Sequence, residues 1–172
     1  MKYYITESGR QQLETRISEQ NQKIRTIQAE KSIAYTASGD GWHDNPGYNQ
    51  LIQLEERAIT ELKNLEQQLA SGVLWLRHDR NTAQVQIGSI VRFSMQAARD
   101  RLPREVIYEI GGHGESDLAR QLISYTSPIG AALYELRPGM EVEVQIPAGR
   151  TRLRILSLHA TWEETRAVPM RA

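Results

Sequence analysis

The chain of 172 residues contains no cysteine. This absence excludes a disulfide scaffold, a thiolate metal site and a cysteine nucleophile, and it fits a reducing compartment. No apolar run approaches the roughly 18 residues of a membrane span, and the N-terminal MKYYITESG lacks the apolar core of a signal peptide. The 21 basic residues balance 21 acidic ones, which argues against non-specific duplex binding as the main role because that needs a basic surface. We therefore expect a soluble, cytoplasmic protein with no membrane partner.

The common signatures of catalytic sites are also missing. None of the four histidines has a second histidine four residues away, whereas a zinc site needs three or four converging ligands. No Gly-x-Ser-x-Gly, Walker or dinucleotide fingerprint is present. The glycine-rich residues 111–114 precede no clear helix, so a turn explains them better than phosphate binding.

Residues 1–76 predict a helical hairpin. Thr6 is expected to cap the first helix. Apolar residues then follow a 4,3 spacing in two runs, one starting at Leu13 and one at Tyr48, which is typical of a coiled-coil seam. Residues 38–47, SGDGWHDNPG, cannot stay helical and are expected to form the tip of an antiparallel hairpin. About 27 residues per helix would give an arm of roughly 40 Å. A coiled coil that dimerises is the alternative that this pattern leaves open.

Residues 77–172 change to the period of β-strands. Alternating or β-branched runs are separated by turn signals such as Arg137-Pro138-Gly139. A short helix is expected between Ser127 and Leu136, with Ser127 as its cap and Pro128 at its first position. We expect an α+β domain, an antiparallel sheet wrapped on one short helix. The expected strands are residues 83–93, 105–110, 141–146 and 151–156.

The tip of the arm carries two carboxylates, those of Asp40 and Asp44, with Trp42 and His43 between them. Two carboxylates on a tight turn can converge on Mg²⁺, which prefers oxygen ligands. The structural alternatives are that Asp44 or Asn45 caps the second helix and that Asp40 is a turn residue. An exposed aromatic residue such as Trp42 is typical of a contact surface.

Arg16, Lys23 and Arg25 lie on the first predicted helix. They are candidates for contacts with an RNA backbone, where they would act as point charges. A solvated helix face with glutamate partners is the alternative.

The chain resembles the bacterial Gre family of transcript cleavage factors over nearly its whole length. YYITESGRQQLETRI looks like the family's Thr-x-x-Gly start and leucine-bearing helix, and GDGWHDNPGYNQL is similar to its Gly-Asp-x-x-Glu-Asn-x-x-Tyr tip. The more specific part is C-terminal, where four blocks follow in the family's order: IGSIV, YEIGGHGESD, ISYTSPIGAAL and IPAGRTRLRIL.

The resemblance implies both a fold and a partner. The fold is a coiled-coil hairpin (residues 1–76) followed by an FKBP-like domain (residues 77–172) that docks on bacterial RNA polymerase. The arm would pass through the secondary channel and bring Asp40 and Asp44 to the nascent RNA 3′ end. There the two acids would share a Mg²⁺ supplied by the polymerase active site, and the polymerase would cleave backtracked RNA. The resemblance thus implies a monomeric accessory factor, not an enzyme, with no tightly bound cofactor.

The tip differs from the family pattern. With Asn45 and Tyr48 aligned on the family's Asn and Tyr, Asp44 takes the place of a Glu and Gly41 takes the place of an Asp. Trp42, His43, Asn45 and Tyr48 are the expected tip contacts. The alternative function is a non-cleaving Gre-like regulator or inhibitor that occupies the channel.

The resemblance also implies a docking surface on the C-terminal domain, formed by Asp117, Ser127, Pro128 and Ile129. A helix start and a turn explain these residues equally well. An FKBP-like domain raises prolyl isomerisation as a further alternative, which would need a pocket lined by aromatic residues.

Overall fold

The computed structural model describes residues 3–38, 45–76, 80, 82–97, 100–147 and 149–166. They form two compact units. The first comprises residues 10–72, and the second comprises residues 3–9 together with the chain from residue 73 onward. The division expected from the sequence, between residues 76 and 77, assigned residues 3–9 to the first domain, whereas the structure assigns them to the second unit.

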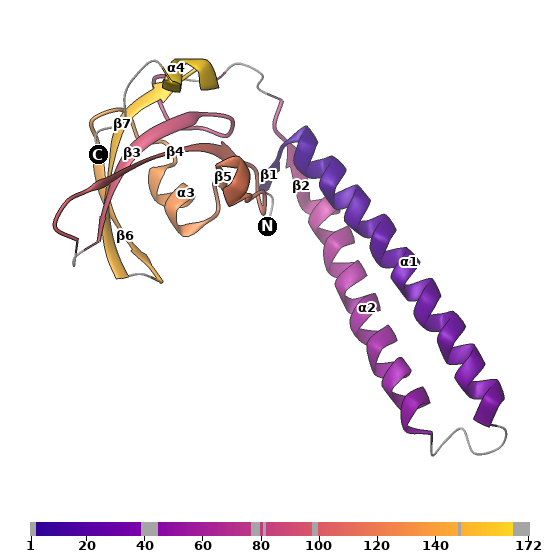
Figure 1. The fold of residues 1–172 in the computed structure, drawn as a ribbon. Helices are drawn as coiled ribbons and strands as arrows, with labels where there is room; N and C mark the ends of the chain where they lie inside the picture. Colours follow the sequence, from indigo (N-terminus) through magenta and orange to yellow (C-terminus); the bar gives the residue numbers. More distant parts are fainter. Residues whose placement is uncertain are drawn as a thin grey trace. The chain divides into compact units, whose positions relative to one another are not determined.

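Two helices form the arm. α1 spans Glu7–Ser38 and α2 spans Pro46–Ser71, and they run antiparallel (Figure 1). With 32 and 26 residues, they are about 48 and 39 Å long at about 1.5 Å per residue. No described helix is long and apolar enough to cross a membrane.

The seam between α1 and α2 follows the predicted 4,3 spacing. Ile24, Ile27 and Ala58 form a small buried cluster, with Leu51 and Leu62 packed against it. The apolar stripe of each helix is therefore covered by the other helix of the same chain. The predicted hairpin is confirmed.

Thr6 begins α1, as predicted. Its Oγ1 accepts a hydrogen bond from Gly9 N at 3.1 Å, which is the geometry of an N-cap. Thr6 N and Thr6 Oγ1 in turn donate to the Glu115 carboxylate at 2.8 and 2.7 Å. A Cβ on Gly9 or Gly112 would lie 2.0 or 2.3 Å from Glu115 Oε1. Glycine at both positions therefore makes room for the buried Glu115 side chain.

A five-stranded sheet with the order β5-β4-β3-β7-β6 is the frame of the second unit. Figure 1 shows this sheet curling around the short helix α3. The α+β class is confirmed. The bounds are β3 Ile90–Ala97, β4 Arg104–Gly111, β5 Leu122–Ser124, α3 Pro128–Leu133, β6 Glu141–Ile146 and β7 Gly149–His159.

Shorter elements complete the second unit. β1 (Tyr3–Ile5) pairs with β2 (Gly72–Leu74) in a separate two-stranded sheet. The 3₁₀ helix η2 spans Leu118–Arg120, and α4 spans Trp162–Arg166.

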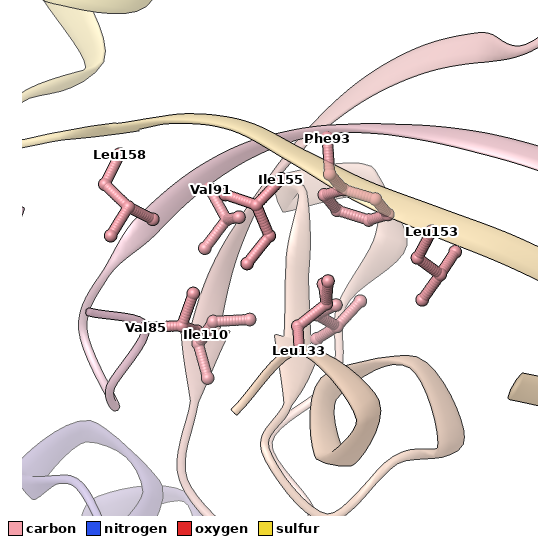
Figure 2. Close-up of a cluster of buried hydrophobic side chains, with 9 residues drawn as sticks. Val85, Val91, Phe93, Ile110, Leu133, Leu153, Ile155 and Leu158 are labelled. Atoms are coloured by element: carbon pink, nitrogen blue, oxygen red, sulfur yellow. The ribbon is translucent and has the colours of Figure 1, made fainter. Parts of the chain in front are cut away.

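The core of the second unit lies between the curled sheet and α3. Alternate residues of β3 and β7 point to this side, as the period of a strand requires, and Leu133 of α3 meets them (Figure 2). Phe93 and Leu133 have no exposed surface. The buried members are Val85, Val91, Phe93, Ile110, Ile123, Leu133, Leu153, Ile155 and Leu158.

Two strand predictions need correction. The strand expected over residues 83–93 begins only at Ile90, because Gly88 turns the chain with a φ of +88°. Val85 instead exchanges hydrogen bonds with the segment after α3, at 2.9 Å to Leu136 O and 2.9 Å from Glu135 N. The alternating apolar pattern of residues 83–89 therefore reflects burial of Val85 and not a strand.

The expected antiparallel sheet holds for four strands, but β5 runs parallel to β4. The connection through residues 112–121, which contains η2, carries the chain back to the level of Glu109 on β4 before β5 begins. A three-residue strand is too short to show its direction in a sequence pattern.

α4, in the segment after β7, is held by polar contacts to β4. Trp162 Nε1 of α4 donates to Glu109 Oε2 at 3.2 Å, while Glu109 Oε1 accepts from Arg80 Nη2 at 3.0 Å. Arg80 also donates to Ala160 O at 3.2 Å. α4 is therefore tied to β4 through one carboxylate.

Candidate functional site

The arm resumes after its tip at Asn45, the N-cap of α2. Asn45 Oδ1 accepts hydrogen bonds from Gly47 N at 2.9 Å and from Tyr48 N at 3.2 Å. Pro46 occupies the first helical position, where its missing N–H costs nothing. Asn45 therefore fills the capping position that Asp44 was also a candidate for.

The remaining tip residues lie outside the described part of the chain. These are Asp40, Trp42, His43 and Asp44. Their assignment as tip acids and tip contacts stays a prediction, as do the polymerase contacts expected of Asn45 and Tyr48.

Tyr48 lies in the first turn of α2 and is half-buried in the seam. Its ring centroid lies 6.0 Å from that of Tyr35 on α1, with an interplanar angle of 50°. Tilted aromatic pairs at this distance attract each other. The pair closes the seam near the end of the arm that leads to the tip.

Three polar residues interrupt the apolar seam, and all three have partners. Gln20 is buried and donates from Nε2 to Ala58 O at 2.9 Å. Lys31 of α1 forms an ion pair with Glu55 of α2, and Gln28 Nε2 donates to Glu55 Oε1 at 2.9 Å. The hydrogen bond from Lys31 is the main reason that the pKa of Glu55 lies below its usual value of 4.5.

Arg16, Lys23 and Arg25 are exposed on α1 and lie away from the seam. They form no ion pair with any other described residue. The glutamate partners of the structural alternative are therefore not seen in this part of the chain. The position of the three side chains is compatible with contacts to a polyanion, which stay a prediction.

No cluster of three or more Asp, Glu or His side chains in the described ranges could hold a metal ion. The two predicted Mg²⁺ ligands, Asp40 and Asp44, are not among the residues that this statement covers.

The predicted docking residues around α3 have well-defined structural roles. Ser127 Oγ accepts from Gly130 N at 3.1 Å and donates to Ser124 O at 2.7 Å, so it caps α3 and ties it to β5. Pro128 is exposed at the first position of the helix, and Ile129 packs against the core. Of these three residues, only Pro128 is exposed.

Asp117 forms an antiparallel bridge with Leu122, the first residue of β5. Its Oδ1 accepts from Ala119 N at 3.0 Å and from Arg120 N at 3.2 Å, which caps η2. Its backbone exchanges two 2.9 Å hydrogen bonds with Leu122. Asp117 therefore bonds to the first residue of β5 and Ser127 to the last, and each is also a capping residue.

Ser124 organises this region and was not identified from the sequence. Its Oγ donates to Gly112 O at 2.6 Å and accepts from Gly114 N at 3.1 Å and Thr126 N at 3.2 Å. It is almost fully buried. The Ser124 hydroxyl therefore joins the loop of residues 111–116 to the segment that leads to α3. The sequence signal that could have identified Ser124 is its place in the family-like block ISYTSPIGAAL.

Several aromatic residues of the second unit pack in or against its core. Phe93 is fully buried, and its ring lies 6.1 Å from that of Tyr108. The rings of Tyr125 and Tyr134 lie 5.4 Å apart. Phe93 therefore cannot line an open proline pocket, which weakens the prolyl isomerase alternative.

Comparisons with known proteins agree with this architecture. Residues 80–160 match the family model described as "Transcription elongation factor, GreA/GreB, C-term". The transcription elongation factor GreA of Roseiflexus castenholzii is 33% identical over 159 residues, which cover 90% of this chain and 96% of that protein. GreA of Alkaliphilus oremlandii is 34% identical over 129 residues, covering 74% of this chain and 76% of that protein.

A solved structure gives a more distant match. The crystal structure of GreA factor homolog 1 from Thermus thermophilus aligns with a TM-score of 0.43 at 19% identity, covering 92% of this chain and 99% of that one. The match to the Roseiflexus protein covers 90% of this chain and therefore includes residues of both units. The chain belongs to the GreA/GreB family of transcription elongation factors.

Proposed function

We propose that this protein binds bacterial RNA polymerase through the secondary channel and stimulates intrinsic cleavage of backtracked RNA. The polymerase would perform the hydrolysis and this chain would act as a monomeric accessory factor. The observation that carries the proposal is the arm: a hairpin about 40 Å long whose seam is filled by its own two helices, in a member of the GreA/GreB family.

The proposed reactive end of the arm is the tip between Ser38 and Asn45. Asp40 and Asp44 are the residues we assign to a Mg²⁺ ion of the polymerase, because carboxylates are ligands that Mg²⁺ accepts together with phosphate oxygens. In such a site the ion stabilises the attacking and leaving oxygens of a phosphoryl transfer. Capping of α2 by Asn45 supports the assignment, since the helix does not need Asp44 as its cap.

Two further surfaces belong to the proposal. Arg16, Lys23 and Arg25 would contact RNA phosphates along the arm, and Asp117, Ser127, Pro128 and Ile129 would contact the polymerase surface. The second assignment is supported by the hydrogen bonds of Ser127, which fix the start of α3 and so hold the exposed Pro128 in place.

The test is RNA cleavage in a stalled, backtracked elongation complex, measured with Mg²⁺ and with the wild-type chain or a variant. Asp44→Ala and Asp40→Ala should each lower the stimulated rate by about 10²-fold, because a misplaced or missing ligand costs on that order. Glu61→Ala removes an exposed carboxylate in the middle of α2 and should retain the wild-type rate. Binding is measured in the same samples and should be equal for all three variants.

Each outcome decides between the candidates. Wild-type cleavage by Asp44→Ala would contradict the catalytic assignment of the tip. A wild-type chain that binds the complex but leaves cleavage unchanged or suppressed would instead indicate a regulator that occupies the channel. A chain that does not bind would overturn the whole proposal.

A further inference from the structure

The arm contains an ion pair where a coiled-coil seam ordinarily contains apolar residues. Lys31 and Glu55 occupy positions of the 4,3 repeat on α1 and α2. Their side chains are mostly covered, with 27% and 13% of their surfaces exposed. Two isolated charges at such positions would be unfavourable, but here each charge faces the other.

The pair belongs to a small polar network across the helices. Gln28, one turn before Lys31 on α1, donates to Glu55 Oε1 while Lys31 binds Glu55 Oε2. Both carboxylate oxygens are therefore bound from α1. Further from the tip, Gln20 reaches across the seam to Ala58 O at 2.9 Å.

These contacts distinguish one alignment of the helices from its neighbours. The apolar positions repeat every seven residues, so a slip of one heptad would again bring apolar side chains together. The same slip would move Glu55 from Lys31 to Ile24 and leave a carboxylate against an apolar side chain. It would also displace α2 along α1 by about 10 Å.

We propose that the polar network of Gln28, Lys31 and Glu55 is a register lock that fixes where the tip of the arm lies. A single polar residue at a core position is known to specify the register of coiled coils at a cost in stability. The functional part of this inference rests on the proposed function, because only a tip that works by placement needs a fixed register. The three residues act as positioning residues and do not contact RNA or metal.

The register can be measured without the polymerase. The chain has no cysteine, so Gln12→Cys and Gln53→Cys introduce two unique sites for spin labels on exposed positions of α1 and α2. Because these positions are far apart along the arm, a slip changes their separation by nearly its full length. Electron–electron distance measurements are made on the otherwise wild-type chain, on Lys31→Met/Glu55→Met, and on the charge-swapped Lys31→Glu/Glu55→Lys.

The wild-type background should give one narrow distance distribution. The apolar pair should keep the helical content, since replacing a covered ion pair by apolar residues need not destabilise, but its distribution should broaden or gain a second maximum displaced by about 10 Å. The swapped pair restores the attraction and should give a single maximum. An unchanged narrow distribution for the apolar pair would overturn the register lock.

A transcript cleavage assay then tests whether stimulation of cleavage requires the fixed register. The apolar pair should bind the backtracked complex but stimulate cleavage at least about tenfold less than wild type, and the swapped pair should recover most of the rate. Wild-type cleavage by the apolar pair despite an altered distance would overturn the functional part. If the wild-type chain does not stimulate cleavage, the proposed function fails, while the distance measurement still decides the lock.

Discussion

Small residues and capping side chains decide the local geometry on which the candidate sites depend. Asn45 starts α2 directly after the tip, and Ser127 starts α3 beside β5. Gly130 then allows the helix to approach the strand, because a Cβ at this position would lie 2.0 Å from Ser124 O. The Ser127 hydroxyl therefore fixes the start of the proposed docking segment, and the absence of a Cβ at Gly130 lets that segment pack against β5.

Replacement of Gly130 by alanine should test this contact. The added methyl group overlaps a backbone oxygen, and overpacking of this kind costs about 1–3 kcal/mol of unfolding free energy. Thermal and denaturant unfolding of the full chain would measure it. Ala131→Gly, at the exposed neighbouring position, is the matched control and should cost no more than about 1 kcal/mol through helix propensity. Equal stability of Gly130→Ala and wild type would mean that α3 does not pack on Ser124 as described.

For individual residues, the sequence predicted helix N-caps better than it predicted contacts between residues far apart in the chain. Thr6 and Ser127 were each identified from residue type and position, and Asn45 was one of two candidates with Asp44, because capping is a local property. The Glu115 carboxylate that binds Thr6 is 109 residues away in the chain, and no local pattern reports such a pairing. The Gly-Gly pair at residues 111 and 112 was assigned to a turn, although Gly112 also makes room for Glu115.

Among the elements, the arm differs from an ordinary coiled coil in its polar seam contacts. The apolar cluster of Ile24, Ile27 and Ala58 lies between two polar contacts, Gln20 with Ala58 O and Lys31 with Glu55. The apolar cluster supplies stability, whereas the polar contacts make alternative alignments unfavourable.

The stability of the arm should depend on pH through Glu55. Its pKa is lower in the folded chain than its usual value of 4.5, chiefly because Lys31 donates to it. The folded state therefore binds this proton less readily than the unfolded state, so the contribution of Glu55 is complete above pH 4.5 and is lost as the pH falls through the lower, folded pKa.

Helical melting of the wild-type chain and of Glu55→Gln at a series of pH values isolates this effect from the other carboxylates. The two proteins should differ most at neutral pH and converge as the solution becomes acidic. A difference that stays constant across the acidic range would contradict the ion pair.

Element prediction succeeded where a pattern was long. The 4,3 spacing identified both arm helices, and the alternation of residues 141–146 identified β6 within its observed bounds. It failed for β1, β2 and β5, which have three residues each, and for residues 83–89, where the alternation reflects burial of Val85 and Ile87 outside a strand. Three residues do not define a period, and burial of one face does not require a strand.

At the scale of the whole molecule, the two units suit different tasks. The hairpin has a narrow seam with a small buried cluster, so it buries little apolar surface but is thin enough for the proposed entry into a channel. The curled sheet has the larger core. The resemblance seen in the sequence named the family correctly because its four C-terminal blocks all lie within residues 80–160, the range that the family model matches. The tip acids, Asp40 and Asp44, lie outside the described residues, and the cleavage assay tests their role.

The central claim is that the arm enters the polymerase and carries its tip to the RNA 3′ end. The most direct measurement attaches an iron chelate to a single introduced cysteine and maps where hydroxyl radicals cut a backtracked elongation complex. Gln50→Cys places the chelate in the first turns of α2, and Asn64→Cys, also exposed, places it about 21 Å further from the tip.

The account predicts that radicals from position 50 cut the RNA near its 3′ end and the polymerase near its catalytic site, and that radicals from position 64 cut only outside that region. Identical patterns from the two positions, or no cuts near the RNA 3′ end in a complex whose binding has been verified, would contradict it.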